Sequence, residues 1–250
     1  MTDAIQLLNQ HFSATYDDWV RIKDTLKGQF AGLKDDAFLA ERPATKFILA
    51  WMKKLGEFQT KFGHLFGRNK RPPKSDDFTA AVAICLEQFL AARGLGERVG
   101  SEETTHRMKG AQRPDVLVYS PAGPLLATVE CKTDLGWNRK GWKGEIHERT
   151  RQLQASCPGS ELFLCILTQS NWDYSEFASA PECGKQWFCL STVPVGRISD
   201  PVADTDILLP IEPLFLAVLA KMRAGLVELI QQLPLDEQQT ILRRLSEQRG

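Results

Sequence analysis

The feature that most constrains the fold is a pair of strand-like segments, at residues 114–120 and 125–133, joined by a short connection. Both segments are rich in β-branched or large apolar residues, a composition typical of strands. The connection contains three turn-forming residues, Pro121, Gly123 and Pro124. The pattern predicts a β-hairpin. If its turn is centred on this connection, the numbers of facing residues add to 245, and Asp115 lies opposite Glu130.

Three charged residues lie at one end of this hairpin. Because side chains alternate along a strand, Glu130 and Lys132 share one face of the second arm. The other face is apolar and consists of Leu125, Ala127, Val129 and Cys131. Facing side chains are about 4.5–5.5 Å apart at Cβ, so Asp115 and Glu130 repel each other unless a cation or a proton intervenes. The alternative is an ordinary solvated strand face, but a solvated face would scatter its charges. The hairpin therefore predicts half of a metal site with an ammonium group beside it.

The pattern Pro114-Asp115, a spacer, then Glu130-x-Lys132 resembles the signature of the PD-(D/E)XK nuclease superfamily. The core of that family is a helix, a three-stranded meander, a helix and a strand. Matching segments flank the hairpin here: an apolar helix at 77–93, an amphipathic helix at 145–156 and a buried strand at 161–168. The resemblance covers about residues 75–170. It implies an α/β (α+β) fold with a restriction-endonuclease-like core, in which helices flank a mixed central sheet, with helical N- and C-terminal additions.

The resemblance also implies a Mg²⁺-dependent site, with Mn²⁺ as a substitute. Asp115, Glu130 and the backbone carbonyl of Cys131 would hold the metal, and hard oxygen ligands of this kind suit Mg²⁺. Lys132 would contact the attacked phosphate and stabilise the anionic transition state. The family often adds an acidic residue on the helix before the hairpin, which here is Glu87. That residue is either a further ligand with a catalytic role or a group on the thin solvent face beside Gln88.

Basic residues that can contact DNA are concentrated in one segment, although the net charge of the chain is zero. From Glu41 to Ser75 there are nine basic and two acidic residues. The segment ends in a basic connector that contains Arg68, Lys70 and Arg71. The excess either follows a phosphate backbone or is a solvated helix face. The apolar face of the same segment is core or a dimer interface.

A second candidate for DNA contact is the loop after Lys132. It carries two Gly-Trp pairs, and between them lie Asn138, Arg139 and Lys140. These side chains either read base edges or contact phosphates, and the two tryptophans are either core residues or ligand contacts. The helix that follows carries Arg149 and Arg151, which are also candidates for DNA contact.

Three regions follow along the chain: a helical N-terminal region with the basic connector at 1–74, a catalytic core at 75–200 and C-terminal helices at 201–250. The last strand of the core is expected at 186–195 and a long helix at 212–232. The six cysteines include no Cys-x-x-Cys pair and are expected to be reduced thiols of a cytoplasmic protein. Neither a signal peptide nor a membrane-spanning segment is expected.

The expected function is a type II restriction endonuclease that cuts double-stranded DNA and acts as a homodimer, so that two sites cut two strands. A repair, junction-resolving or phage-defence nuclease of the same fold is the alternative within this class. A catalytically silent DNA-binding module is the alternative from another class. The complete set of Asp115, Glu130 and Lys132 argues against the silent module, because nothing else would hold three charges together.

Overall fold

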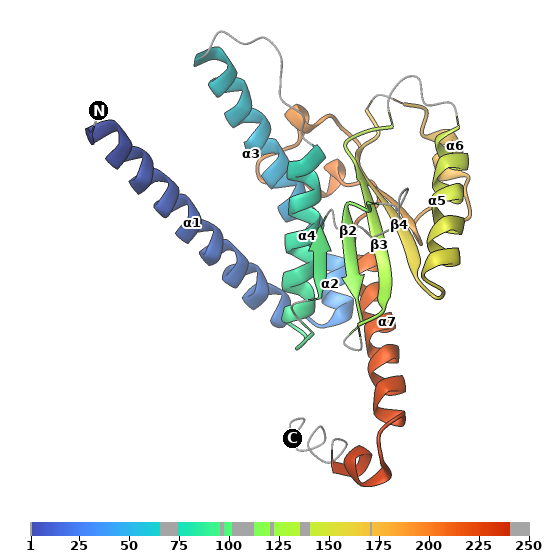
Figure 1. Cartoon of the computed structure of the whole chain (residues 1–250). Helices are drawn as coiled ribbons and strands as arrows, with labels where there is room; N and C mark the ends of the chain where they lie inside the picture. Colours follow the sequence, from blue (N-terminus) through green and yellow to red (C-terminus); the bar gives the residue numbers. More distant parts are fainter. Residues whose placement is uncertain are drawn as a thin grey trace.

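A mixed five-stranded sheet forms the centre of the molecule (Figure 1). The computed structural model describes residues 2–65, 75–95, 98–101, 113–120, 123–135, 141–170 and 172–240. The strands are β1 (Val99–Ser101), β2 (Val116–Tyr119), β3 (Leu125–Lys132), β4 (Glu161–Thr168) and β5 (Trp187–Ser191), and they are adjacent in this order. The first three form an antiparallel meander, and β4 and β5 are then added in parallel. The predicted α/β class is confirmed.

Helices flank both faces of this sheet. They are α1 (Thr2–Ala31), α2 (Asp35–Glu41), α3 (Pro43–Leu65), α4 (Ser75–Ala91), α5 (Trp142–Ser156), α6 (Ser175–Ala178) and α7 (Glu212–Gln231), with short 3₁₀ helices η1 (Val195–Arg197) and η2 (Asp204–Asp206). α4 and α7 pack on one face of the sheet and α5 packs on the other (Figure 1). The predicted order of helix, meander, helix and strand is therefore found as α4, β1 to β3, α5 and β4.

The central helix, α4, is buried because its sequence is apolar on almost every side. It contacts α1 and α3 as well as the strands β1, β2 and β3. Asp76 and Asp77 lie in its first turn, where negative charge interacts favourably with the helix dipole. The chain leaves the helix at Gly94, whose φ of +76° is accessible to glycine without a steric penalty.

The register of β2 and β3 is the one predicted from the sequence. Val116 pairs with Val129, and each pair up to Val118 and Ala127 keeps the sum of 245. The register then shifts, so that Tyr119 pairs with Leu125. This irregularity corrects the expectation that Leu125 shares one apolar face with Val129. Leu125 is half-buried and packs against the apolar cluster under α5, whereas Val129 is buried in the cluster under α4 and α7. The end of β3 that carries the charged residues is unaffected.

The strand expected at 186–195 is shorter, because β5 ends at Ser191. The Oγ of Ser191 donates to the carbonyl of Val193 at 2.9 Å, which turns the chain back on itself. Pro194 follows and has no N–H with which to continue a ladder. The next residues form η1.

The N- and C-terminal helices share one core with the sheet. Buried residues of α1, α3, α4, α7 and the strands form a single apolar cluster, and the first half of α1 extends away from it (Figure 1). The long C-terminal helix expected at 212–232 is found as α7, and residues 235–240 are also helical. Within the described part of the chain, no helix is both long and apolar enough to cross a membrane.

Candidate active site

The two carboxylates of the hairpin meet at the end of β3. Asp115 directly precedes β2, and its register with Glu130 follows from the pairing of Val116 with Val129. The Oδ2 of Asp115 accepts a hydrogen bond from the backbone N–H of Cys131 at 2.7 Å. The last residue pair of β2 and β3 at this end is Val116 with Val129. Beyond it, the Asp115 carboxylate takes the place of a backbone acceptor for the N–H of Cys131. This contact fixes its position beside Glu130.

Lys132 lies between the two carboxylates. Its Nζ is 3.1 Å from Oε2 of Glu130 and 3.7 Å from Oδ2 of Asp115. The side chain of Glu130 is only 4 % exposed, whereas those of Lys132 and Asp115 are 26 % and 25 % exposed. A buried carboxylate without a cation would be strongly destabilising. The ammonium group therefore compensates the deepest charge of the cluster and still reaches the surface.

A fourth charge, Arg149 of α5, also belongs to this cluster. Its NH1 atom is 2.6 Å from Oε1 of Glu130. From the sequence, Arg149 was expected to contact DNA, and its ion pair with Glu130 was not predicted. The spacing in α5 carried the signal: Arg149 is three residues after the buried Ile146 and four before the buried Leu153, and residues at such spacings share one helix face. Arg149 therefore lies on the stripe of α5 that faces the sheet.

Arg151, the other candidate on α5, is differently placed. It pairs with Glu148 one turn earlier, and its side chain is 77 % exposed. Arg151 therefore does not join the carboxylate cluster. It remains a surface residue for which contact with DNA is still a prediction.

The environment of the cluster shifts the ionisation of Asp115. Burial raises the pKa of Asp115 above its usual range. The N–H of Cys131 and the charges of Lys132 and Arg149 act in the opposite direction, while the neighbouring charge of Glu130 raises the pKa further. Burial also raises the pKa of the Cys131 thiol well above its ordinary value, so this thiol stays protonated at neutral pH. Cys131 thus contributes to the site through its backbone.

Glu87 is placed apart from the two carboxylates. Its Oε2 is 2.8 Å from Nζ of Lys23 on α1. The residue of α4 that interacts with Cys131 is Thr79, and Glu87 lies eight residues further along the helix, roughly 12 Å along its axis. Glu87 is partly exposed and is neutralised by α1, and the structure does not bring it to the cluster.

Four described basic residues of the 41–75 segment, Arg42, Lys46, Lys53 and Lys54, have partners within the molecule. Lys46 lies 3.1 Å and Arg42 3.9 Å from Asp204, and Lys54 pairs with Asp200. Acidic residues near η2 thus offset part of the local charge excess. Arg68, Lys70 and Arg71 lie outside the described residues, as do Asn138, Arg139 and Lys140. Their contact with DNA stays a prediction.

The second tryptophan of the Gly-Trp loop is a core residue. Trp142 begins α5 and is only 6 % exposed. Its ring lies 5.1 Å from that of Trp187 and 6.0 Å from that of Phe177, measured between centroids. Of the two alternatives for this ring, the structure supports packing. Trp142 anchors the start of the helix that carries Arg149.

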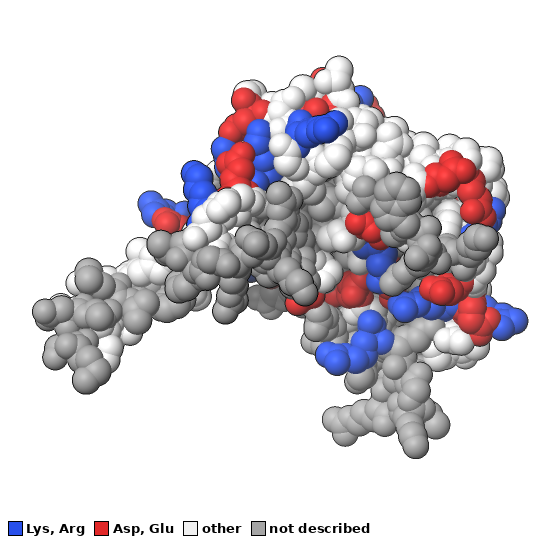
Figure 2. Space-filling view, turned by 90° about the horizontal axis from the view of Figure 1, so that it is seen from above, with Lys and Arg blue, Asp and Glu red and all other residues white. Residues whose placement is uncertain are grey.

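Figure 2 views the molecule from above Figure 1, onto the end at which β3 ends and α5 begins. Among the described residues visible there, basic and acidic side chains lie next to one another and form no broad surface of one sign (Figure 2). The balance matches the zero net charge of the chain.

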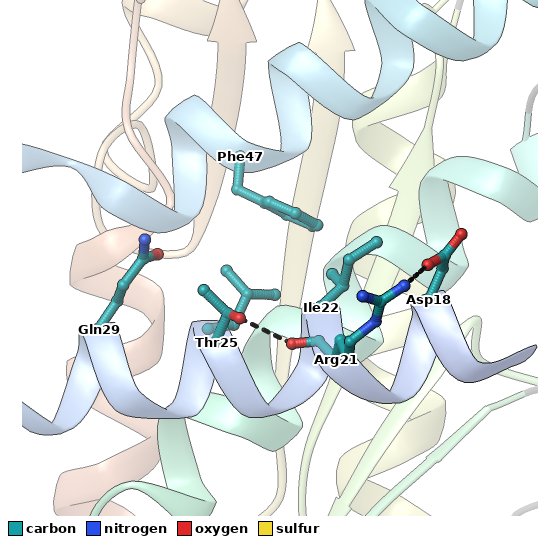
Figure 3. Close-up of a pocket in the computed structure, with 7 residues that line it drawn as sticks. Asp18, Arg21, Ile22, Thr25, Gln29 and Phe47 are labelled. Carbon is teal, nitrogen blue, oxygen red and sulfur yellow. Dashed lines mark hydrogen bonds and ion pairs between the residues drawn. The ribbon is translucent and has the colours of Figure 1, made fainter. Parts of the chain in front are cut away.

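The hollow between α1 and α3 lacks a comparable cluster (Figure 3). It is lined by Asp18, Arg21, Ile22, Thr25, Leu26, Gln29 and Phe47. Phe47 points from α3 toward α1, and Arg21 pairs with Asp18 of its own helix (Figure 3). Because this charged pair is satisfied within α1, the end of β3 is the better candidate site.

The donor atoms at the end of β3 fit a hard divalent cation. Among the described residues, no group of three or more His, Cys, Asp or Glu side chains could hold a metal. Mg²⁺ needs only one or two carboxylates, because it keeps several waters and takes phosphate oxygens. Asp115 and Glu130 provide two, since both lie within 4 Å of one ammonium nitrogen. The N–H and C=O of a strand residue point to the same side, so the Cys131 carbonyl lies toward Asp115.

No protein-family model matches the chain. No curated protein and no solved structure matches it either.

Proposed function

We propose that the protein is a metal-dependent deoxyribonuclease of the PD-(D/E)XK type, with a restriction-endonuclease-like core. One observation carries the proposal: Asp115, Glu130 and Lys132 converge at the ends of β2 and β3, and the lysine nitrogen lies 3.7 and 3.1 Å from the two carboxylates. The order of elements from α4 to β4 supports it. The most specific form of the proposal is a homodimeric type II restriction endonuclease that acts on double-stranded DNA.

Each group has a role in hydrolysis of a phosphodiester. Asp115, Glu130 and the Cys131 carbonyl would hold Mg²⁺, or Mn²⁺ in its place. When bound, the metal supplies charge stabilisation at the phosphate and a more acidic water. Lys132 donates to a non-bridging phosphate oxygen, where negative charge develops in the transition state. Its 26 % exposure lets substrate reach the ammonium group while Glu130 keeps it oriented.

The test is incubation of the purified protein with supercoiled plasmid and Mg²⁺. Discrete fragments are the expected result, because a restriction endonuclease reads a fixed sequence. A smear would support a nuclease of the same type without sequence specificity, such as a repair or phage-defence enzyme. EDTA should abolish cleavage, and Ca²⁺ should support DNA binding but not cutting, because its looser coordination activates water poorly.

The matched control is Asp115→Asn, which keeps an oxygen for the Cys131 N–H and removes the charge. Equal cleavage by this variant would reveal a contaminating nuclease. Full activity of the wild type in EDTA would overturn the site assignment. DNA binding without cleavage in any divalent metal would favour a silent DNA-binding module. Sedimentation in the presence and absence of DNA tests the homodimer.

A further inference from the structure

Both oxygens of the Glu130 carboxylate are held by cations. Oε1 lies 2.6 Å from NH1 of Arg149, and Oε2 lies 3.1 Å from Nζ of Lys132. The Glu130 side chain is 4 % exposed, so water cannot replace these partners. A metal ion that takes Glu130 as a ligand must therefore compete with at least one of the two cations.

Arg149 is the partner better suited to leave. Lys132 is two residues from Glu130 on the same strand and contacts both carboxylates. Arg149 reaches Glu130 from another element, α5, and its side chain is 42 % exposed. A guanidinium group also matches the geometry of a phosphate as well as that of a carboxylate. Arg149 can thus exchange one oxyanion for another and keep a charged acceptor throughout.

The charges of the cluster show what such an exchange achieves. Asp115 and Glu130 carry two negative charges, and Lys132 and Arg149 carry two positive charges. Without metal the charges of these four groups add to zero, so that the groups offer no net attraction to a phosphate. A divalent cation adds two positive charges, which suits the phosphodiesters of a DNA backbone. Binding of metal and binding of DNA at this site should therefore strengthen each other.

We propose that Arg149 and a divalent cation exchange places at Glu130, an inference that rests on the proposed function. The guanidinium group holds Glu130 while the metal is absent. It passes to a non-bridging oxygen of the DNA backbone when the carboxylate becomes a metal ligand. Arg149 thereby couples metal binding to DNA binding, and it keeps the buried Glu130 neutralised before either ligand arrives.

The exchange is tested by titrating Mn²⁺ into DNA-free protein by calorimetry. Arg149→Gln should bind Mn²⁺ about tenfold more tightly than the wild type, because the metal no longer competes with a hydrogen bond between charged groups. The control is Arg21→Gln, which removes an arginine–carboxylate pair on α1 and should leave the Mn²⁺ affinity unchanged. Weaker or unchanged Mn²⁺ binding by Arg149→Gln would overturn the exchange and make Arg149 a fixed support.

The second readout is the DNA affinity with and without Ca²⁺, which reports the coupling without cleavage. The factor by which Ca²⁺ tightens DNA binding should fall about tenfold in Arg149→Gln relative to the wild type. An undiminished factor would overturn the role of Arg149 at the phosphate.

Two further measurements keep the inference falsifiable. If Arg149→Gln does not fold, as judged by circular dichroism, Arg149→Lys retains the charge but loses the planar fork. The lysine variant should show the same two changes to a smaller extent, and wild-type values in both readouts would overturn the inference. A wild-type protein that binds no Mn²⁺ and cuts no DNA would instead refute the proposed function.

Discussion

Two regions of the molecule are each organised around a buried carboxylate, and they treat it in opposite ways. At the junction of α3 and α7, Glu212 is fully buried and accepts hydrogen bonds from the backbone N–H of Thr45 at 2.9 Å and from its hydroxyl at 2.6 Å. At the end of β3, Glu130 is held by the charged side chains of Lys132 and Arg149.

The contact of Glu212 with Thr45, called the joint below, is structural, whereas Glu130 lies in a site whose charged partners can change. The donors to Glu212 are neutral and lie in the first turn of α3, where unpaired N–H groups and the helix dipole favour an anion. Thr45 Oγ1 in turn accepts from the N–H of Ile211 at 2.9 Å, so both helices are fixed. The partners of Glu130 are the ends of long, partly exposed side chains, which can move to another anion.

The largest effect expected from this comparison is on turnover. Lys132→Ala should lower kcat for DNA cleavage by at least about 10²-fold, the scale for loss of one oriented donor in a transition state. DNA binding should survive, because the lysine is a small part of the phosphate contacts. Single-turnover cleavage and a binding titration measure the two effects separately.

The matched control for that variant is Lys221→Ala. Lys221 is also a partly exposed lysine in an ion pair, with Glu161 at 3.1 Å, but it lies outside the cluster and should leave kcat unchanged. Normal cleavage by Lys132→Ala would mean that the hairpin charges are only a solvated strand face.

At the joint, Glu212→Gln should lower the stability of the protein and leave its activity unchanged. An amide nitrogen would replace one acceptor oxygen and face a donor, which should cost about 1–3 kcal/mol of the free energy of unfolding. Activity per folded molecule should not change. Urea unfolding measures the loss, with the variant Asp18→Asn of the exposed Arg21–Asp18 pair as a control expected to change stability by less than about 1 kcal/mol. Equal losses in the two variants would remove the distinction between joint and surface pair.

The joint should also show a pH dependence of a definite sign. Burial raises the pKa of Glu212 above its ordinary value of 4.5, although the hydrogen bonds from Thr45 oppose the shift. A carboxyl whose pKa rises on folding adds stability below its ordinary pKa, and this contribution is lost as the pH rises through the raised value. The stability advantage of the wild type over Glu212→Gln should thus be larger near pH 4 than near pH 7. A constant difference across this range would show that folding does not shift the pKa of Glu212.

The smallest effect is expected at Glu87, a third carboxylate that belongs to neither region. Because Glu87 pairs with Lys23 on α1, Glu87→Gln should give a Mg²⁺ titration of cleavage that superimposes on that of the wild type. Its stability should fall by less than about 1 kcal/mol, as for other partly exposed pairs. A clear rise in the Mg²⁺ concentration needed for half-maximal cleavage would restore Glu87 as a ligand.

The sequence was sufficient for the hairpin but insufficient for contacts between distant elements. Strand alternation and turn residues placed Glu130 and Lys132 on one face, and the register followed from the turn. The partner of Glu87 was hidden because α4 is apolar on nearly every side, so that periodicity does not reveal which neighbour covers each face. To predict the ion pair of Arg149, one must know which face of α5 is turned toward the sheet. The spacing of Arg149 from the buried Ile146 and Leu153 indicates that face.

The contact between Thr45 and Glu212 has a consequence for the order in which the chain folds. The two residues are 167 positions apart, so closing this contact requires an unusually long loop. During synthesis, the first turn of α3 has no buried acceptor for these donors until residue 212 has emerged from the ribosome. We therefore expect the N-terminal helices to dock late, after the sheet and α7 have formed, and a chain that stops before α7 to leave the start of α3 open to proteases.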